Sequence, residues 1–226
     1  MCGRIVRDRT EDYGERFGLV DFRETRVLPR FNIAPTQMDL IVRTRDDGRH
    51  LEESRWGLVP VWAKERSIGG RMFNARSETL LEKTAFKGLV KGRRCVIPAS
   101  GFFEWQKAPS GKVPLYIYRA DGAPLALAGL YTFWRDPGND EWVTSHTIVT
   151  CGPNEFMAPI HNRMPVVLGS EALDLWLNSE IDEPAQVLHL LQPCPDDWLT
   201  CHRVSSLVNN VRNQGPELVE PAGDAR

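Results

Sequence analysis

The second residue of the chain carries the most reactive pair of groups in the sequence. Met1 precedes Cys2, and an initiator methionine is commonly removed when the next residue is small. Removal would leave Cys2 with an α-amine and a thiol on adjacent carbons. The amine has an ordinary pKa of about 7.7–8.0, and positive neighbours such as Arg4 would lower the thiol pKa from about 8.5. Such a pair condenses with an aldehyde, first to an imine and then to a five-membered thiazolidine. The alternative is that Cys2 is simply a small residue that starts a strand.

Three further polar residues are of the types that proton transfer at such a site needs. His161 lies on an irregular segment between Pro159 and Pro165, and a histidine pKa near neutrality suits a proton carrier. Glu104 stands alone among large apolar residues, where desolvation would raise the pKa of a carboxylate. Asn74 could orient a substrate carbonyl or hydroxyl. The structural alternatives are a satisfied histidine, a strand glutamate that faces water, and an asparagine in a turn or helix cap.

Aromatic and arginine side chains alternate in the first half of the chain. Trp62, Trp105 and Arg76 are of the types that stack on bases and hold phosphates. A tryptophan in a mixed domain usually lies in the core, and we interpret Trp56 and Trp176 in this way. The sequence contains no recognition helix or zinc finger, so single-stranded nucleic acid is favoured over sequence-specific reading of a duplex.

The charge is distributed unevenly along the chain. Residues 1–119 carry 23 basic and 15 acidic side chains, whereas residues 120–226 carry 5 basic and 15 acidic ones, although the whole chain has a net charge of −2. The stretch from Lys83 to Phe103 contains five basic residues and no acid. This pattern predicts a polyanion as partner. The alternative is that the two halves fold together and their charges pair.

The composition excludes several other classes of protein. The 226 residues, 42% of them apolar, suffice for one substantial globular domain. The first residues contain no hydrophobic signal core, and no apolar run approaches the ~20 residues of a membrane span, so secretion and membrane insertion are disfavoured. Five cysteines without dense spacing indicate reduced thiols in the cytoplasm. Cys194, Cys201 and His202 have the wrong spacing for zinc, and phosphate-binding glycine loops are missing from the sequence, so we expect neither metal nor cofactor.

These residues must be positioned mainly by short strands. Runs typical of strands occur at residues 39–43, 94–97, 115–118, 125–128 and 142–150. Helices are expected at residues 79–86, behind the capping box Thr79–Glu82, at residues 170–177 with Ser170 as N-cap, and at residues 184–191. Because strands and helices do not alternate, the sequence predicts one α+β domain with a mainly antiparallel sheet.

Together the motifs resemble one family, the SRAP (SOS response associated peptidase) proteins, also called abasic site processing proteins. The matching segments occur in family order and cover nearly the whole chain to about residue 220. They are Met1–Arg4, Arg30–Pro35, Trp56–Trp62, Asn74–Thr79, Gly101–Trp105, Ile148–Thr150, His161–Pro165 and Val211–Gly215. The resemblance implies a SRAP domain over residues 1–220, built on a distorted β-barrel-like sheet, and a flexible tail over residues 221–226.

The resemblance also implies a chemistry. After removal of Met1, Cys2 would form a thiazolidine cross-link with the aldehyde of an abasic site in DNA, as part of the DNA damage response. Asn74, Glu104 and His161 are similar to the family's other catalytic residues. Glu104 would act as general acid–base, His161 would protonate the sugar oxygen as the ring opens, and Asn74 would orient Cys2 and the sugar. Reversal of the cross-link, lyase activity at the abasic site and self-cleavage after Met1 are further activities that this resemblance suggests.

The family also supplies an expectation for DNA binding. Thr84 occupies a place where we expect the family to carry an arginine, so that contact stays unassigned. The residues similar to family positions in the DNA groove are Arg4, Asn32, Pro35, Trp62, Arg76, Trp105, Thr150 and Arg163. The implied partner is single-stranded DNA that contains abasic sites, with replication-fork proteins as further partners. A cytoplasmic monomer without metal, cofactor or membrane is expected.

Two other classes of function stay open. Class II glutamine amidotransferases also begin with Met-Cys-Gly, which suggests an N-terminal-nucleophile hydrolase, although 226 residues leave little room for their usual synthase domain. The other class is a non-catalytic module for single-stranded DNA, in which Cys2 is incidental. Glutamine hydrolysis would favour the first class, and DNA activities that survive a Cys2→Ala substitution would favour the second.

Overall fold

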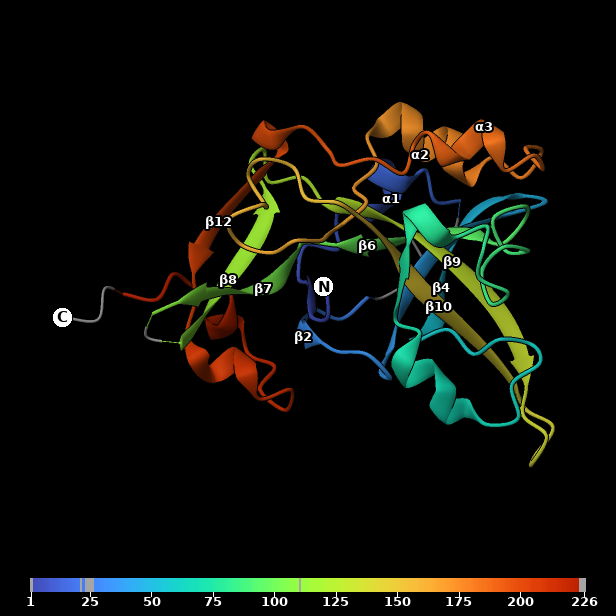
Figure 1. Ribbon diagram of the computed structural model, residues 1–226, viewed down its shortest axis with the longest axis horizontal. Coiled ribbons are helices and arrows are strands. Elements are labelled where there is room, and N and C mark those ends of the chain that lie inside the picture. Colours follow the sequence, from blue (N-terminus) through green and yellow to red (C-terminus); the bar gives the residue numbers. More distant parts are fainter. Residues whose placement is uncertain (1, 21, 23–26, 110, 224–226) are drawn as a thin grey trace.

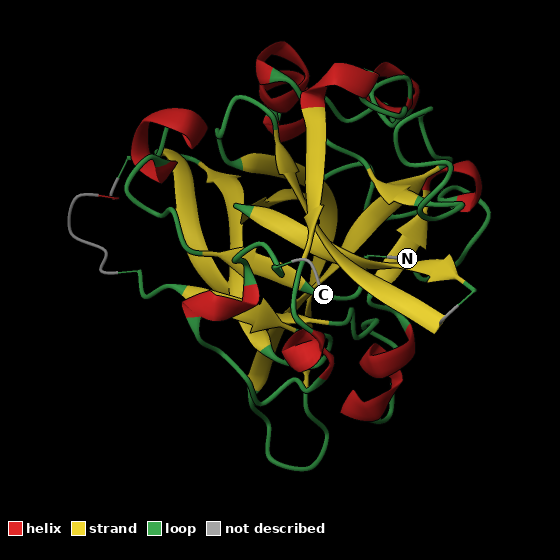
Figure 2. Ribbon diagram, turned by 90° about the vertical axis from the view of Figure 1, so that its left-hand side faces the viewer, coloured by secondary structure: helices red, strands yellow, loops and turns green. Residues whose placement is uncertain are grey.

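Five strands close into a barrel in the computed structural model, which describes residues 2–20, 22, 27–109 and 111–223. Around the barrel they follow the order β10 (Trp142–Cys151), β4 (Gly48–Trp56), β3 (Met38–Arg45), β6 (Arg94–Ala99) and β9 (Leu125–Arg135), and β9 pairs again with β10. The β10–β4 pair is parallel, and the other four pairs are antiparallel. The strands cross at the centre of the molecule, and the helices lie around them (Figure 2). The predicted distorted barrel in an α+β domain is confirmed.

A second antiparallel sheet adjoins the barrel. Its order is β12 (Leu199–Arg203), β8 (Gly111–Arg119), β7 (Gly101–Ala108), β1 (Ile5–Arg7) and β2 (Arg30–Ile33). β6 of the barrel continues into β7 after the single residue Ser100, so the two sheets share one nearly continuous stretch of chain. The N-terminal strand β1 lies between β2 and β7 (Figure 1). This arrangement brings the residues that precede β1, including Cys2, to the junction of the two sheets.

Two short strands extend along β10. β5 (Asn74–Arg76) runs parallel to it, with Asn74 opposite Ile148 and Arg76 opposite Thr150. β11 (Met164–Pro165) runs antiparallel to it, with Pro165 also opposite Thr150. Backbone hydrogen bonds therefore fix the candidate residues of β5 against the end of β10, independently of their side chains.

The helices are short, and one predicted helix is absent. α2 (Ser170–Leu177) has the predicted bounds, although Gly169 rather than Ser170 is its N-cap. α3 (Ala185–Leu188) is shorter than predicted. The helix expected at residues 79–86 is wrong: a 3₁₀ turn at Ser77–Thr79 is followed by successive turns to residue 92. A segment this short gains too little from helix propagation to offset nucleation. The remaining elements are α1 (Tyr13–Phe17), η2 (Arg66–Arg71), η4 (Asp196–Trp198), η5 (Ser206–Asn209) and η6 (Pro216–Leu218).

The hydrophobic core fills the barrel and the space between the barrel and α2. Trp56 and Trp176 are fully buried, and their indole N–H groups donate to the carbonyls of Phe73 and Cys95, both at 2.9 Å. Their interpretation as core residues is confirmed. All five cysteines are free thiols. Within the described part of the chain, no helix has both the length and the apolar character required to cross a membrane.

The C-terminal segment is tied to the second sheet. Val208 and Leu218 are fully buried in a small cluster with residues of β1, β7 and β8. The backbone N–H of Ala222 donates to Arg203 at 2.8 Å. Residues 224–226 lie outside the described residues, so the flexible tail over 221–226 stays a prediction. The segment from η5 to η6 thus belongs to the folded domain and can form part of a site.

A buried histidine of β10 predicts how stability depends on pH. His146 is fully buried, and its Nδ1 lies 2.9 Å from Ser54 Oγ. Burial lowers the pKa of His146 to about 3. The unfolded chain therefore takes up a proton near its ordinary pKa of about 6.5, whereas the folded chain does not. The stability is fully present above pH about 6.5 and decreases as the pH falls towards 3. Between pH about 6.5 and 5 the expected loss from this residue is about 2 kcal/mol.

Urea unfolding at several pH values measures this loss. A His146→Gln variant keeps a polar side chain that can bond to Ser54 but cannot take up the proton. Its free energy of unfolding should be lower than that of the wild type at neutral pH and should fall less steeply on acidification. Equal acid slopes for the two proteins would show that another group controls the loss.

Candidate active site

Cys2 is held in the interior by an asparagine from another strand. Its side chain is fully buried, and its carbonyl accepts a hydrogen bond from Nδ2 of Asn74 at 2.8 Å. The β5–β10 register fixes the backbone of Asn74. The other amide atom, Oδ1, is buried and has no hydrogen-bond partner among the described residues. Asn74 therefore both positions the backbone of Cys2 and holds an unused acceptor close to it.

The electrostatic setting of the thiol differs from the prediction. Burial, and then the negative charge of Glu104, raise the pKa of the Cys2 thiol above its ordinary value. The expected lowering by Arg4 is wrong, because burial has the largest effect on the thiol. The Arg4 guanidinium donates to Asn32 Oδ1 at 2.8 Å and to the Val208 carbonyl at 2.7 Å. The thiol therefore stays protonated at neutral pH, and its attack on any electrophile requires a base.

Glu104 connects Cys2 with an open cavity. Its carboxylate lies on β7 and is almost fully buried, yet it lines a cavity of about 520 Å³ together with His161. Lys107 and Lys112, a directly opposed pair on the β7–β8 hairpin, form another wall. The cavity thus combines a carboxylate, an imidazole and two cations, a set suited to proton transfer and to binding an anion. The two lysines carried no recognisable signal in the sequence, since only the hairpin brings them together.

The backbone of Arg163 holds the imidazole of His161. Its Nδ1 lies 3.0 Å from the backbone nitrogen of Arg163 and 3.1 Å from the carbonyl oxygen of the same residue. The irregular segment that the sequence predicted around His161 is observed as a series of turns and bends from residue 155 to residue 162. The structure thus brings Cys2, Asn74, Glu104 and His161 to one region.

A second group of residues forms a wall next to this cavity. The Arg4 guanidinium lies 5.7 Å from the ring centroid of Trp105, and the Trp105 indole N–H donates to Asn209 Oδ1 at 2.7 Å. Arg4 also donates to the carbonyls of Val208 and Asn209. The C-terminal turn η5 therefore orients two residues for which DNA contacts are predicted. Asn209 gave no signal in the sequence because it lies more than 100 residues from Trp105.

Asn32, which is predicted to contact DNA, forms hydrogen bonds with the C-terminal segment. It is fully buried, and its Nδ2 donates to the carbonyls of Val208, Asn210 and Asn213 at 3.1–3.2 Å. Its side chain has no exposed surface in this structure, and the predicted contact with DNA stays a prediction. Asn32 instead links the C-terminal segment to β2 and accepts a hydrogen bond from Arg4. It therefore supports the wall formed by Arg4 and Trp105 without lining its surface.

Replacing Asn32 should consequently cost stability. An Asn32→Ala variant leaves three carbonyls and the Arg4 guanidinium without this partner, and we expect the free energy of unfolding to fall by about 2–4 kcal/mol. Denaturant unfolding measures the loss. Hydrogen exchange should rise in residues 207–214 first. Asn32→Asp provides the matched control, since it retains the acceptor for Arg4 but lacks the Nδ2 donors. Stability unchanged in the alanine variant would contradict this role.

Arg76 and Arg163, the other two arginines that are predicted to contact DNA, lie at the end of β10. Arg163 forms a two-pronged ion pair with Glu78, at 2.6 and 2.9 Å, and donates to the Thr150 carbonyl at 2.6 Å. Thr150 is fully buried, so it supports Arg163 and has no surface for DNA. Arg76, opposite Thr150, is exposed. Glu78 was missed as a partner of Arg163, although it lies within the motif Asn74–Thr79.

Two predicted contact residues lie on loops that follow strands. Pro35 is half-buried after β2, and Trp62 is exposed on the loop after β4. Among the described residues, no three His, Cys, Asp or Glu side chains gather as metal ligands would. The arrangement therefore offers a nucleophile, proton-transfer groups and exposed cations.

Comparisons with known proteins agree with this arrangement. The family model "SOS response associated peptidase (SRAP)" matches residues 1–211. The chain is 41% identical to abasic site processing protein YoqW of Bacillus subtilis, with 97% of this chain and 99% of that protein aligned. It is 34% identical to YedK of Escherichia coli, with 98% and 100% aligned, and 34% identical to HMCES of Gallus gallus, with 98% and 78% aligned; both carry the same descriptive name.

Solved structures match the fold. A crystal structure of a protein from Bacteroides thetaiotaomicron superposes with a TM-score of 0.84 at 24% identity, covering 98% of this chain and all of that one. A crystal structure of a protein from Bordetella bronchiseptica superposes with a TM-score of 0.78 at 25% identity, covering 91% of this chain and all of that one. The chain therefore belongs to the SOS response associated peptidase (SRAP) family.

Proposed function

We propose that this protein processes abasic sites by binding single-stranded DNA and cross-linking Cys2 to the aldehyde of the lesion. The observation that carries the proposal is the junction of Cys2 with Asn74 and Glu104 beside the cavity that also contains His161. The names of relatives that are 34–41% identical support it. The excess of basic side chains in residues 1–119 suits an anionic polymer.

The reaction begins at the amine because the thiol is protonated. After Met1 is removed, the α-amine of Cys2 attacks C1′ of the open sugar, and the carbinolamine that forms loses water to give an imine. The Cys2 Sγ then attacks the imine carbon, and its proton passes by way of Glu104 to the nitrogen, which closes the thiazolidine. His161 donates a proton to the ring oxygen of the sugar as the ring opens and takes one back from the C1′ hydroxyl, and Asn74 Oδ1 accepts from the amine. One water is lost in total.

DNA would approach over the exposed cations of the site. Arg76 and the Arg4–Trp105 pair are suited to hold a phosphate and a base. Arg163 is preorganised by Glu78 and Thr150, although the ion pair with Glu78 competes with a phosphate. Trp62 presents an exposed ring on which a flanking base can stack.

Intact-mass measurement tests the proposal. The purified protein is incubated with a single strand that contains one abasic site, or with the same strand undamaged. We expect a protein that lacks Met1, and an adduct, stable to denaturation, with the mass of protein plus DNA less one water. Retained Met1 together with no adduct, despite DNA binding, would leave only a binding module. Release of ammonia from glutamine would instead favour the amidotransferase class.

A further inference from the structure

A second groove lies on the barrel wall, outside the region of Cys2. It has a volume of about 540 Å³ and is formed by the loop after β4, the turns after β5 and the β9–β10 hairpin. We call it the Trp62–Trp142 groove. Its lining residues are Pro60, Val61, Trp62, Thr84, Ala85, Gly88, Leu89, Arg93, Thr132, Phe133 and Trp142. None of these described residues is acidic, and Arg93 is the single charged one.

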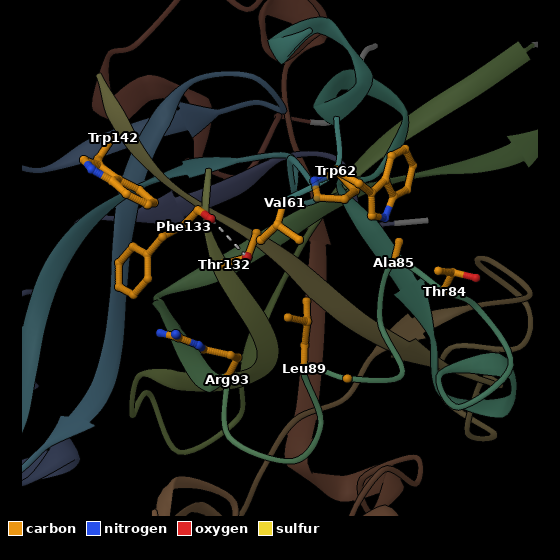
Figure 3. A pocket seen from close by; sticks show the side chains of 11 residues that line it. Val61, Trp62, Thr84, Ala85, Leu89, Arg93, Thr132, Phe133 and Trp142 are labelled. Atoms are coloured by element: carbon orange, nitrogen blue, oxygen red, sulfur yellow. Dashed lines mark hydrogen bonds between the residues drawn. The ribbon is translucent and has the colours of Figure 1, made fainter. Parts of the chain in front are cut away.

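The groove presents aromatic surface to solvent. Trp62 and Trp142 are 54% and 68% exposed, and they lie on opposite sides of the groove, with Val61 between them and Phe133 beside Trp142 (Figure 3). Two exposed tryptophans at one groove are unusual, because large apolar side chains are normally buried. Rings held apart in this way offer separate faces on which flat ligand groups can stack.

The cation of the groove is held against the same aromatic surface. The Arg93 guanidinium lies 4.9 Å from the ring centroid of Phe133 and 5.6 Å from that of Tyr131, while the residue stays exposed. Stacking restricts the long side chain and leaves its N–H groups available to an anion. A ligand with both flat and anionic groups therefore matches the groove.

The wall that carries Arg93 belongs to the basic stretch of the sequence. Lys83, Lys87, Lys91 and Arg93 are exposed along successive turns. The fifth basic residue, Arg94, is buried and donates to backbone carbonyls that include Trp176 and Val90, so it anchors this wall. Lys91 also lies 3.6 Å from Asp182, and the exposed Glu141 precedes Trp142. The positive charge thus concentrates at the Arg93 side.

The groove and the region of Cys2 lie along the same strand. β10 extends from Ile148, opposite Asn74, to Trp142 at the rim of the groove. Six residues of extended strand span about 20 Å. A single strand of DNA that is bound at Cys2 can therefore reach the groove within a few nucleotides.

We propose that the Trp62–Trp142 groove binds the nucleotides that flank the abasic site on one side, with a base stacked on Trp142 and a phosphate on Arg93. The proposal deepens the proposed function and rests on it for the identity of the polymer. An acidic peptide would also meet Arg93, but it would not explain the two exposed tryptophan rings of the groove.

Equilibrium binding of undamaged single-stranded DNA of about 12 nucleotides tests the groove without the cross-link. We expect Trp142→Ala to weaken binding about tenfold, and Arg93→Ala to reduce the log–log salt slope by about 0.7. Arg203→Ala is the matched control, since it removes one exposed cation from β12 in the second sheet, outside the residues that line the groove. Unchanged binding in both groove variants would overturn the proposal and leave the groove to a protein partner.

A pair of abasic strands shows whether one flank is bound. Each carries about eight nucleotides, on only the 5′ or only the 3′ side of the lesion. At subsaturating DNA, Trp142→Ala should slow capture of one strand about tenfold and leave the other unchanged. The proposal is wrong if Trp142→Ala captures both strands at the wild-type rate, or if it slows the capture of both strands equally. If the wild type captures neither strand while Trp142→Ala still weakens undamaged DNA, the cross-linking function fails and the groove stands.

Discussion

A Cys2→Ala variant is expected to form no denaturation-resistant adduct with an abasic strand, whereas its binding of undamaged DNA stays at the wild-type level. The thiol closes the thiazolidine, and without it the reaction stops at an imine, which water reverses. Denaturing electrophoresis and intact mass measure the adduct. The substituted side chain is buried and only slightly smaller, so the thermal midpoint should confirm that the variant is folded.

Two further proteins separate the amine from the thiol. Cys2→Ser keeps the amine, and borohydride should trap its imine with the abasic strand, as it should for Cys2→Ala. A chain that retains Met1 has no α-amine on Cys2 and should give neither the imine nor the stable adduct. A denaturation-resistant adduct of Cys2→Ala, formed without borohydride, would show that another residue is the nucleophile.

A Glu104→Gln variant is expected to lower the rate of adduct formation by about 10²–10⁴ at neutral pH. The thiol of Cys2 is protonated, since burial and the charge of Glu104 raise its pKa, so ring closure needs a group that takes the thiol proton. Glutamine cannot accept that proton. Quenched time courses with saturating abasic DNA measure the rate, and Glu104→Asp is the control that keeps the charge on a shorter side chain.

Glu104→Gln should also have a second effect, on the pKa of the Cys2 thiol, which acts in the opposite direction on the rate. Removing the negative charge beside the thiol favours the thiolate, so the pKa of Cys2 should fall in Glu104→Gln. The adduct-forming rate of Glu104→Gln should therefore begin to rise with pH at a lower alkaline pH than the rate of Glu104→Asp, which keeps the negative charge. Wild-type rates in Glu104→Gln across the whole pH range would exclude Glu104 from both roles.

Much of the fold and the identity of the central residues followed from local sequence. β-branched and aromatic runs predicted β3, β6, β8, β9 and β10, because strand preference depends on side chains that fit a pleated, half-buried surface. Ser170 as N-cap and the acidic residues that follow it predicted α2, although the N-cap is Gly169. Cys2, Asn74, Glu104 and His161 were identified by residue type and by short motifs, and these are the residues that the fold brings to one region.

Only the tertiary structure determined the pKa of the Cys2 thiol and the contacts that the neighbouring residues make. Burial reversed the expected shift of the Cys2 thiol pKa, and the fold directed Arg4 towards the C-terminal segment. It also buried Asn32 and Thr150 behind the wall on which they were expected to contact DNA. Residue type and spacing predict which chemistry is available. Packing sets the pKa values and decides which side chains reach the surface, because desolvation and hydrogen bonding depend on atoms that lie far apart in the chain.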